Sequence, residues 1–189
     1  MKKTILLAVI ALFLFNNSFA QEEEKSEGFK GAWYGLGALS YVNDEATDAS
    51  SFLILPAVGT FISPTVTVGS AIGLLSTKTG DADANNTFIV MPFVRKYWGV
   101  SDKFFLFGEA NVPLYFNDAA NSYGFFIQPG LDYFIGGKWT IEAKFGRFGY
   151  RSTKPDGGSS TGRTELGFNM FGGNTEDLGA MSFGVKYLF

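Results

Sequence analysis

Apolar residues alternate with small or polar residues along most of this chain, most clearly at its C-terminal end. Successive side chains of a strand point to opposite faces, so one face there carries Met181, Phe183, Val185, Tyr187 and Phe189. The opposite face carries Ala180, Ser182, Gly184, Lys186 and Leu188. One face is broad and apolar and the other is mostly small or polar, which predicts a strand with lipid on its outer side.

Similar alternation recurs from Gly31 onward in stretches of about ten residues, and no stretch has the period of a long amphipathic helix. The pattern predicts eight strands, near residues 31–42, 51–62, 65–76, 87–98, 103–116, 123–135, 138–150 and 178–189. The fold class that follows is all-β, an eight-stranded antiparallel up-and-down transmembrane β-barrel.

The gaps between the predicted strands alternate in character. Short gaps lie at 63–64, 99–102 and 136–137, and longer, more polar gaps lie at 43–50, 77–86, 117–122 and 151–177. Short periplasmic turns and longer external loops are typical of outer-membrane barrels. Residues 165–171 contain enough apolar residues for a strand, and we interpret them as an outward extension of the final hairpin.

An internal repeat supports a barrel assembled from hairpins. Segments beginning at Phe52, Phe88 and Phe125 share the pattern Phe-x-[Ile/Val]-x-Pro-x-[Val/Leu]-x-x-[Phe/Tyr], with prolines 36 and 37 residues apart. A propeller or solenoid would need more units or a different signature. Because proline cannot donate a ladder hydrogen bond, we expect a local bulge or a missing bond at each copy.

Ionisable residues fall repeatedly on the face that the large apolar side chains avoid. In the seventh predicted strand, Glu142 and Lys144 alternate with Ile141, Ala143 and Phe145. The same register places Arg95, Glu109, Asp132, Glu142, Lys144 and Lys186 in the interior. An eight-stranded bore is filled by its own side chains, so we expect an ion-pair network that closes the lumen. The alternative is a conducting pore.

Aromatic residues near the predicted strand ends suit interfacial girdles, although core packing would also use them. They are Trp33, Tyr41, Tyr97, Trp98, Tyr133, Trp139 and Tyr187.

The N-terminal residues resemble a cleaved export signal. A positive start at Met1-Lys2-Lys3 precedes an apolar run and the small-x-small site Ser18-Phe19-Ala20. We therefore expect a signal peptide at 1–20, a short disordered periplasmic lead at 21–30 and the barrel at 31–189. The sequence has no cysteine, which excludes disulfides and a lipoprotein attachment point.

Composition narrows the class of protein further. Charged residues make up 17% of the chain, below the roughly 25% of ordinary soluble domains. The formal net charge is −3, which makes nucleic acid an improbable partner.

The C-terminal residues Ser182, Gly184, Tyr187 and Phe189 match a pattern polar-x-Gly-x-x-apolar-x-aromatic. It resembles the signal by which the outer-membrane assembly machinery recognises unfolded barrels. With the export signal and the hairpin repeat, the chain resembles small outer-membrane barrels of the OmpA and OmpX kind, within the porin-like barrel-domain family. The resemblance implies location in the cell outer membrane, a monomer, and outer-membrane lipid and the barrel assembly machinery as partners.

The residues that most enzymes need are missing. There is no histidine, whereas the outer-membrane barrel enzymes, such as lipid A deacylase and the omptin proteases, resemble one another in relying on one. Glu109 and Glu142 could form an acid/base pair, but an interior salt bridge suits them better. The polar run Asp81-x-Asp83-x-Asn85 lacks the later glycine and glutamate of a calcium loop. We expect no enzymatic activity, no metal and no cofactor.

Three functional hypotheses remain. The first is a closed barrel acting in surface structure, adhesion or protection through its extracellular loops. The second is a narrow passive channel for ions or small solutes. The third is an exported soluble lipocalin-like ligand-binding barrel, although such a barrel would place its charges outside and its apolar residues inside.

Overall fold

The computed structural model describes residues 28–45, 47–167 and 182–189. The predicted signal peptide at 1–20, residues 21–27 of the predicted lead and residues 178–181 of the last predicted strand lie outside the described residues. Within the described part, no helix is long and apolar enough to cross a membrane.

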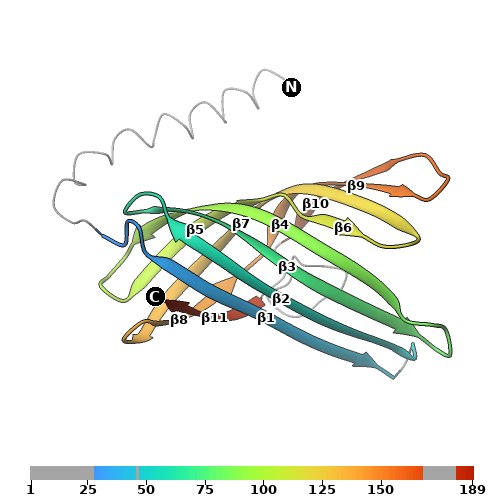
Figure 1. The fold of residues 1–189 in the computed structure, drawn as a ribbon, viewed down its shortest axis with the longest axis horizontal. Coiled ribbons are helices and arrows are strands. Elements are labelled where there is room, and N and C mark those ends of the chain that lie inside the picture. Colours follow the sequence, from blue (N-terminus) through green and yellow to red (C-terminus); the bar gives the residue numbers. More distant parts are fainter. Residues whose placement is uncertain (1–27, 46, 168–181) are drawn as a thin grey trace, which may run out of the picture.

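The described residues form one antiparallel sheet that closes on itself (Figure 1). Its strands are β1 (Trp33–Asp44), β2 (Ala49–Phe61), β3 (Val66–Thr79), β4 (Asn85–Gly99), β5 (Phe104–Asn111), β6 (Leu114–Phe116), β7 (Ala120–Gly136), β8 (Trp139–Lys144), β9 (Arg147–Pro155), β10 (Thr161–Gly167) and β11 (Ser182–Leu188). The barrel closes because β11 pairs with β1, through Tyr34↔Leu188 and the three pairs that follow.

These strands occupy eight positions around the barrel, because three positions are shared by consecutive strands. β5 and β6 both lie between β4 and β7, and β8 and β9 both pair with β7. β10 pairs with β9, and β11 pairs with β8. The predicted all-β, eight-stranded antiparallel barrel is confirmed.

The two ends of the barrel differ. Turns 62–65, 100–103 and 137–138 lie at the same end as Phe29 and Phe189, which we call the terminal end (Figure 1). Turns 80–84, 117–119 and 156–160 lie at the opposite end, beyond which the β9–β10 hairpin projects; we call this the hairpin end.

The long polar gaps predicted at the hairpin end are largely wrong. Strands β1 to β4 and β7 extend into residues assigned to loops, because polar residues such as Ser50 and Lys78 still pair across the ladder. Residues 151–155 and 161–167 of the gap predicted at 151–177 are also strand, since Thr153 pairs with Thr161 and Arg147 with Gly167 in the β9–β10 hairpin. Of residues 165–171, which we expected to extend the final hairpin outward, 165–167 instead pair with the start of β9, and 168–171 lie outside the described residues.

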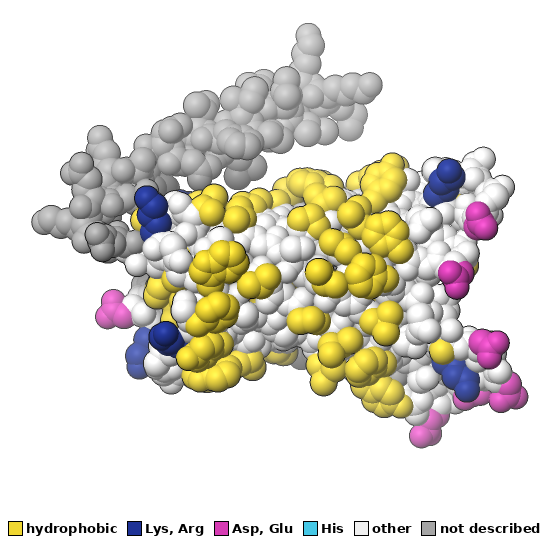
Figure 2. All heavy atoms as spheres, in the orientation of Figure 1, with side chains coloured by type: hydrophobic (Ala, Val, Ile, Leu, Met, Phe, Trp, Pro, Cys, Tyr) yellow, Lys and Arg dark blue, Asp and Glu magenta, His cyan; other side chains and the backbone are white. Residues whose placement is uncertain are grey.

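Large apolar side chains cover the outside of the barrel. Exposed examples from successive strands are Ile54, Val58, Ile72, Leu74, Phe88, Val94, Leu106, Phe125, Ile127, Ile141, Phe148 and Val185, which we call the apolar belt. Figure 2 shows apolar side chains over the middle of the visible face, with charged side chains gathered at both ends. Tyrosine and tryptophan flank the belt at the terminal end, where Trp33, Trp98 and Trp139 are about half exposed. Tyr97, expected in this girdle, is instead buried inside.

The repeat prolines face outward and interrupt the ladder, as expected. Pairing between β2 and β3 skips Leu55 and Pro56 without changing register. The ladder from β4 to β5 and β6 likewise skips Met91 and Pro92, which lie opposite Pro113 and Val112. Because Pro113 has no N–H, the single strand predicted at 103–116 is divided into β5 and β6.

At the third repeat proline, Pro129, the neighbouring strand carries a bulge. Gly130 pairs with Lys144 and Ile127 with Phe148, so two residues of β7 face three residues of the other strand. Gly146 adopts a φ of 68°, which glycine tolerates without strain. The extra residue reverses the alternation: Phe148 is exposed and Arg147 is buried.

Candidate functional site: the barrel interior

Six charged residues expected in the interior all lie there, each carried by a strand. Arg95 is on β4, Glu109 on β5, Asp132 on β7, Glu142 and Lys144 on β8, and Lys186 on β11. Four of them are brought together in two pairs by register alone: Arg95 pairs with Glu109, and Asp132 with Glu142. Arg95, Glu109, Asp132, Glu142 and Lys186 are each no more than 2% exposed.

Arg95 is the centre of the first charge group. Its Nε lies 2.5 Å from Glu109 Oε2, and its Nη1 lies 2.5 Å from Glu142 Oε2. Its Nη2 donates to Glu142 Oε1 at 3.2 Å, which completes a two-pronged contact. The rings of Phe93 and Phe107 lie 4.7 and 4.8 Å from the guanidinium carbon. One arginine thus holds two carboxylates from different strands, an arrangement suited to its planar fork.

Lys144 and two amides extend this group. Lys144 Nζ lies 3.1 Å from Glu109 Oε1 and 3.9 Å from Glu142 Oε1. Asn111 Nδ2 donates to Glu109 Oε1 at 2.8 Å and to Gln128 Oε1 at 2.9 Å. Buried charges are tolerated when they are paired and hydrogen-bonded, and these carboxylates meet that condition.

Lys186 is the centre of the second charge group. It forms an ion pair with Asp132 Oδ2 and donates to the Tyr97 hydroxyl at 3.3 Å. Its Nζ also lies 5.3 Å from the centre of the Tyr34 ring. Arg95 Nη1 donates to the same Tyr97 hydroxyl at 3.4 Å, so Tyr97 connects the two charge groups.

Small residues make room for these inward rings. A Cβ added at Gly130 would collide with the ring of Phe107, and one added at Gly59 would collide with the ring of Tyr34. The glycines of the strands therefore serve packing within the narrow bore.

Sequence reasoning missed two interior cations, Arg147 and Arg151. Arg147 lies over the Phe126 ring, 4.6 Å from its centre, and Arg151 lies 5.0 Å from the centre of the Tyr115 ring. Both follow the bulge at Gly146, where the alternation reverses. The sequence does carry a signal, because the large apolar residues change from odd to even positions between Phe145 and Phe148.

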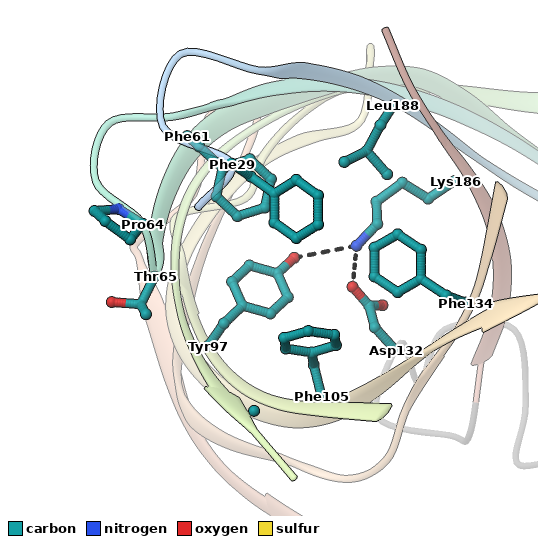
Figure 3. A pocket seen from close by; sticks show the side chains of 11 residues that line it. Phe29, Phe61, Pro64, Thr65, Tyr97, Phe105, Asp132, Phe134, Lys186 and Leu188 are labelled. Atoms are coloured by element: carbon teal, nitrogen blue, oxygen red, sulfur yellow. Dashed lines mark hydrogen bonds and ion pairs between the residues drawn. The ribbon is translucent and has the colours of Figure 1, made fainter. Parts of the chain in front are cut away.

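Aromatic rings gather inside the terminal end (Figure 3). Phe61, Tyr97 and Phe134 are the final residues of the three repeat copies, and Phe105 lies beside Phe134 with ring centres 5.7 Å apart. Phe29 joins them, 5.4 Å from Phe61 and stacked on Phe134 at 5.7 Å. We call these five rings the aromatic mouth. Phe29 was expected in a disordered lead, but its ring packs against the barrel because the mouth offers it two aromatic partners.

The C-terminal residues of the expected assembly signal lie at the seam with β1. The backbone N–H of Phe189 donates to the carbonyl of Trp33 at 2.9 Å, and the Phe189 side chain is exposed. Tyr187 points outward with it, the two rings being 6.5 Å apart. Gly184 and Ser182 lie earlier on β11, where Gly184 pairs with Glu142.

The carboxylates considered for catalysis or metal binding lie in an ion-pair network or on the surface. Glu109 and Glu142, the candidate acid/base pair, both bind Arg95. Among the described residues, no group of three or more acidic, histidine or cysteine side chains could hold a metal ion. Asp81 and Asp83 lie on an exposed turn between β3 and β4.

Comparisons with known proteins give limited information. No family model matches the chain, and no curated protein does. Among solved structures, it is similar to the outer-membrane expressed OmpT of Vibrio cholerae, with 10% sequence identity and a TM-score of 0.33. The alignment covers 84% of this chain and 50% of that chain, so this chain spans half the length of that protein. A similarity this distant carries no functional assignment.

Proposed function

We propose that this protein is a non-enzymatic integral outer-membrane barrel whose lumen is closed by its own side chains. Its role is in surface structure, adhesion or protection, exerted through the turns and the projecting hairpin at the hairpin end. The observation that carries the proposal is the sorting of side chains, with the apolar belt outside and paired charges inside. That sorting is the reverse of what a water-soluble barrel requires.

The energetics of the belt support a membrane location. Residues such as Ile72 and Val185 are more than half exposed, yet they lie midway along their part of the barrel wall. Burying apolar surface stabilises a protein by about 25 cal/mol per Å², and lipid would supply that burial here. The tryptophans at the terminal end suit the membrane–water interface, where aromatic girdles occur. A lipocalin-like barrel in water would leave the whole belt exposed.

The closed lumen is supported by the Arg95 group. Its members come from β4, β5 and β8, so their contacts extend between well-separated parts of the wall. Arg95 and Glu109 are fully buried. Because these charged groups are paired with one another and fill the lumen, they do not attract an ion into it. The narrow channel is the second candidate, and it requires that this network open.

The proposal also fixes an orientation. Outer-membrane barrels have short periplasmic turns and longer extracellular loops, so the end with the projecting β9–β10 hairpin faces outward and the terminal end faces the periplasm. The partners we propose are outer-membrane lipid and the machinery that assembles barrels, the latter recognising Ser182, Gly184, Tyr187 and Phe189. The protein acts as a monomer.

Gel mobility in detergent tests membrane insertion. A folded membrane barrel migrates differently before and after boiling, and we expect this change for the purified protein. Solubility without detergent, together with unchanged mobility, would support the lipocalin-like alternative instead.

Planar-bilayer recording separates the closed barrel from the channel. The closed barrel predicts no sizeable, reproducible single-channel conductance. A steady conductance whose ion selectivity changes in Glu109→Gln would favour the channel and end the proposal of a closed lumen.

A further inference from the structure

We propose that the aromatic mouth holds a binding site for a small neutral alcohol that carries one apolar ring. The site is a partly open pocket at the terminal end, with a cavity volume of about 40 Å³ that displacement of the Phe29 ring would enlarge. Its walls are the five rings of the aromatic mouth, and Lys186 and Asp132 lie at its floor (Figure 3). This inference goes beyond the proposed function and does not depend on it.

The floor of the pocket presents an unused acceptor. Asp132 is 1% exposed, and its Oδ2 pairs with Lys186. Its Oδ1 is buried and has no hydrogen-bond partner among the described residues. Leaving a buried carboxylate oxygen without a donor is costly, so a donor supplied from the pocket would bind there favourably.

The floor also presents an unused donor. The Tyr97 hydroxyl accepts hydrogen bonds from Arg95 and Lys186, neither of which can accept one in return. Within the described residues, the hydroxyl hydrogen of Tyr97 therefore has no acceptor. A ligand hydroxyl both donates and accepts hydrogen bonds. It can therefore donate to Asp132 Oδ1, accept from the Tyr97 hydroxyl, or do both.

The charges at the floor favour a neutral ligand. Lys186 already binds Asp132 and Tyr97, and its Nζ faces the Tyr34 ring at 5.3 Å. An anionic ligand would have to displace one of these contacts. The Lys186–Asp132 pair is itself neutral, so a cationic ligand gains less than it would from an unpaired carboxylate.

The walls determine the apolar part of the ligand. Phe29 shows that a phenyl ring fits between Phe61 and Phe134, at 5.4 and 5.7 Å. It is also the most exposed ring of the mouth, at 37%. A ligand ring can occupy the same place when the Phe29 side chain moves aside. Phe29 therefore competes with the ligand, and its removal should strengthen binding.

The experiment uses isotope-labelled protein in lipid nanodiscs, titrated with benzyl alcohol and, separately, with toluene. Amide resonances of Thr65, Gly99 and Leu188, which line the pocket, report binding. We expect saturable shifts with benzyl alcohol and binding weaker by about fivefold to tenfold with toluene, after correction for partition into lipid. That difference corresponds to one hydrogen bond.

Two variants sharpen the test. Phe29→Ala should tighten benzyl alcohol binding several-fold, whereas Phe125→Ala, which removes the same ring from the apolar belt, should leave it unchanged. Tyr97→Phe should reduce the preference for benzyl alcohol over toluene, and its spectrum reports whether it folds.

Three outcomes would overturn the proposal. One is the absence of saturable shifts in both wild-type protein and Phe29→Ala. Another is equal affinity for toluene and benzyl alcohol. The third is a spread of shifts over belt residues to the same extent as over pocket residues, which would indicate partition into lipid alone.

Discussion

Arg95 and Glu142 are 47 residues apart in sequence, yet Nη1 of the arginine lies 2.5 Å from Oε2 of the glutamate. They stand on β4 and β8, with β5 and β7 between them in the barrel wall. Their contact therefore spans the curved wall and joins two strands that do not pair with each other. A single guanidinium that also binds Glu109 makes this position unusually sensitive to substitution.

Arg95→Met should be strongly destabilising. It leaves Glu109 and Glu142 buried without their main partner, and breaking such a pair costs about 3–5 kcal/mol. The matched control is Lys96→Met, because the next residue of β4 points to the other face and bonds Thr65; its cost should be about 1 kcal/mol or less. Urea unfolding in lipid vesicles measures both. Similar losses in the two variants would contradict a central role for Arg95.

The Lys186–Asp132 pair should show strong energetic coupling. Lys186→Met and Asp132→Asn each leave one polar partner buried, whereas the double variant removes the charge from both. We expect the double variant to be more stable than the sum of the single losses predicts, by about 1–3 kcal/mol. The same unfolding assay gives the three values. Simple additivity would show that the pair does not interact in the folded protein.

Arginine substitutions on the outer face should depend on depth. Ile72 lies midway along β3, where an arginine facing lipid costs roughly 2–4 kcal/mol, whereas near the interface the cost falls to about 0–1 kcal/mol. Val100 lies in the turn after β4 and is also well exposed, which makes Val100→Arg the control. Equal unfolding free energies for Ile72→Arg and Val100→Arg would argue against a surrounding bilayer.

Deleting Gly146 should preserve the barrel. The bulge places three residues opposite two, so removing Gly146 leaves two opposite two, with Arg147 still inward and Phe148 still outward. We expect the deletion variant to keep heat-modifiable gel mobility. Deletion of Leu106, within the regular pairing of β5, should abolish it, because the later residues of that strand would change face. Loss of the barrel in the Gly146 deletion would show that the bulge itself is required for folding.

The role of Phe189 is tested by separating assembly in cells from folding in detergent. If the assembly machinery recognises this residue, Phe189→Ala should lower the amount of barrel in the outer membrane several-fold. The purified variant should still refold in detergent micelles, since the Phe189 ring is exposed. Phe183→Ala changes the same strand and face and serves as control. Equal loss in both variants would point to stability rather than recognition.

Much of the barrel follows from the period-two pattern. Alternation determines which face a side chain occupies, so the inward positions of Glu109, Asp132 and Lys186 can be predicted without any knowledge of their partners. Turn residues then indicate where each strand begins and ends. A closed sheet follows because it leaves no unpaired strand edge in lipid.

The choice of partners cannot be read in the same way. The meeting of Arg95 with Glu142 depends on the curvature of the closed wall, which no sequence period records. Phe29 was missed for another reason: it precedes the alternating region, and its position is determined by rings that come from three hairpins. The bulge at Gly146 leaves a trace in the sequence, but only as a change of parity among the apolar residues.

The pairing of β1 with β11 affects the order in which the barrel folds. Tyr34 must meet Leu188, although synthesis delivers one long after the other. Each hairpin can form from strands that are neighbours in sequence. Closure instead joins residues separated by nearly the whole barrel sequence, and it therefore has the largest entropic cost of loop closure. Until the last strand arrives, β1 keeps an open edge that invites pairing with other chains. Closure is therefore the final step, and the chain must be kept from aggregating until that step is complete.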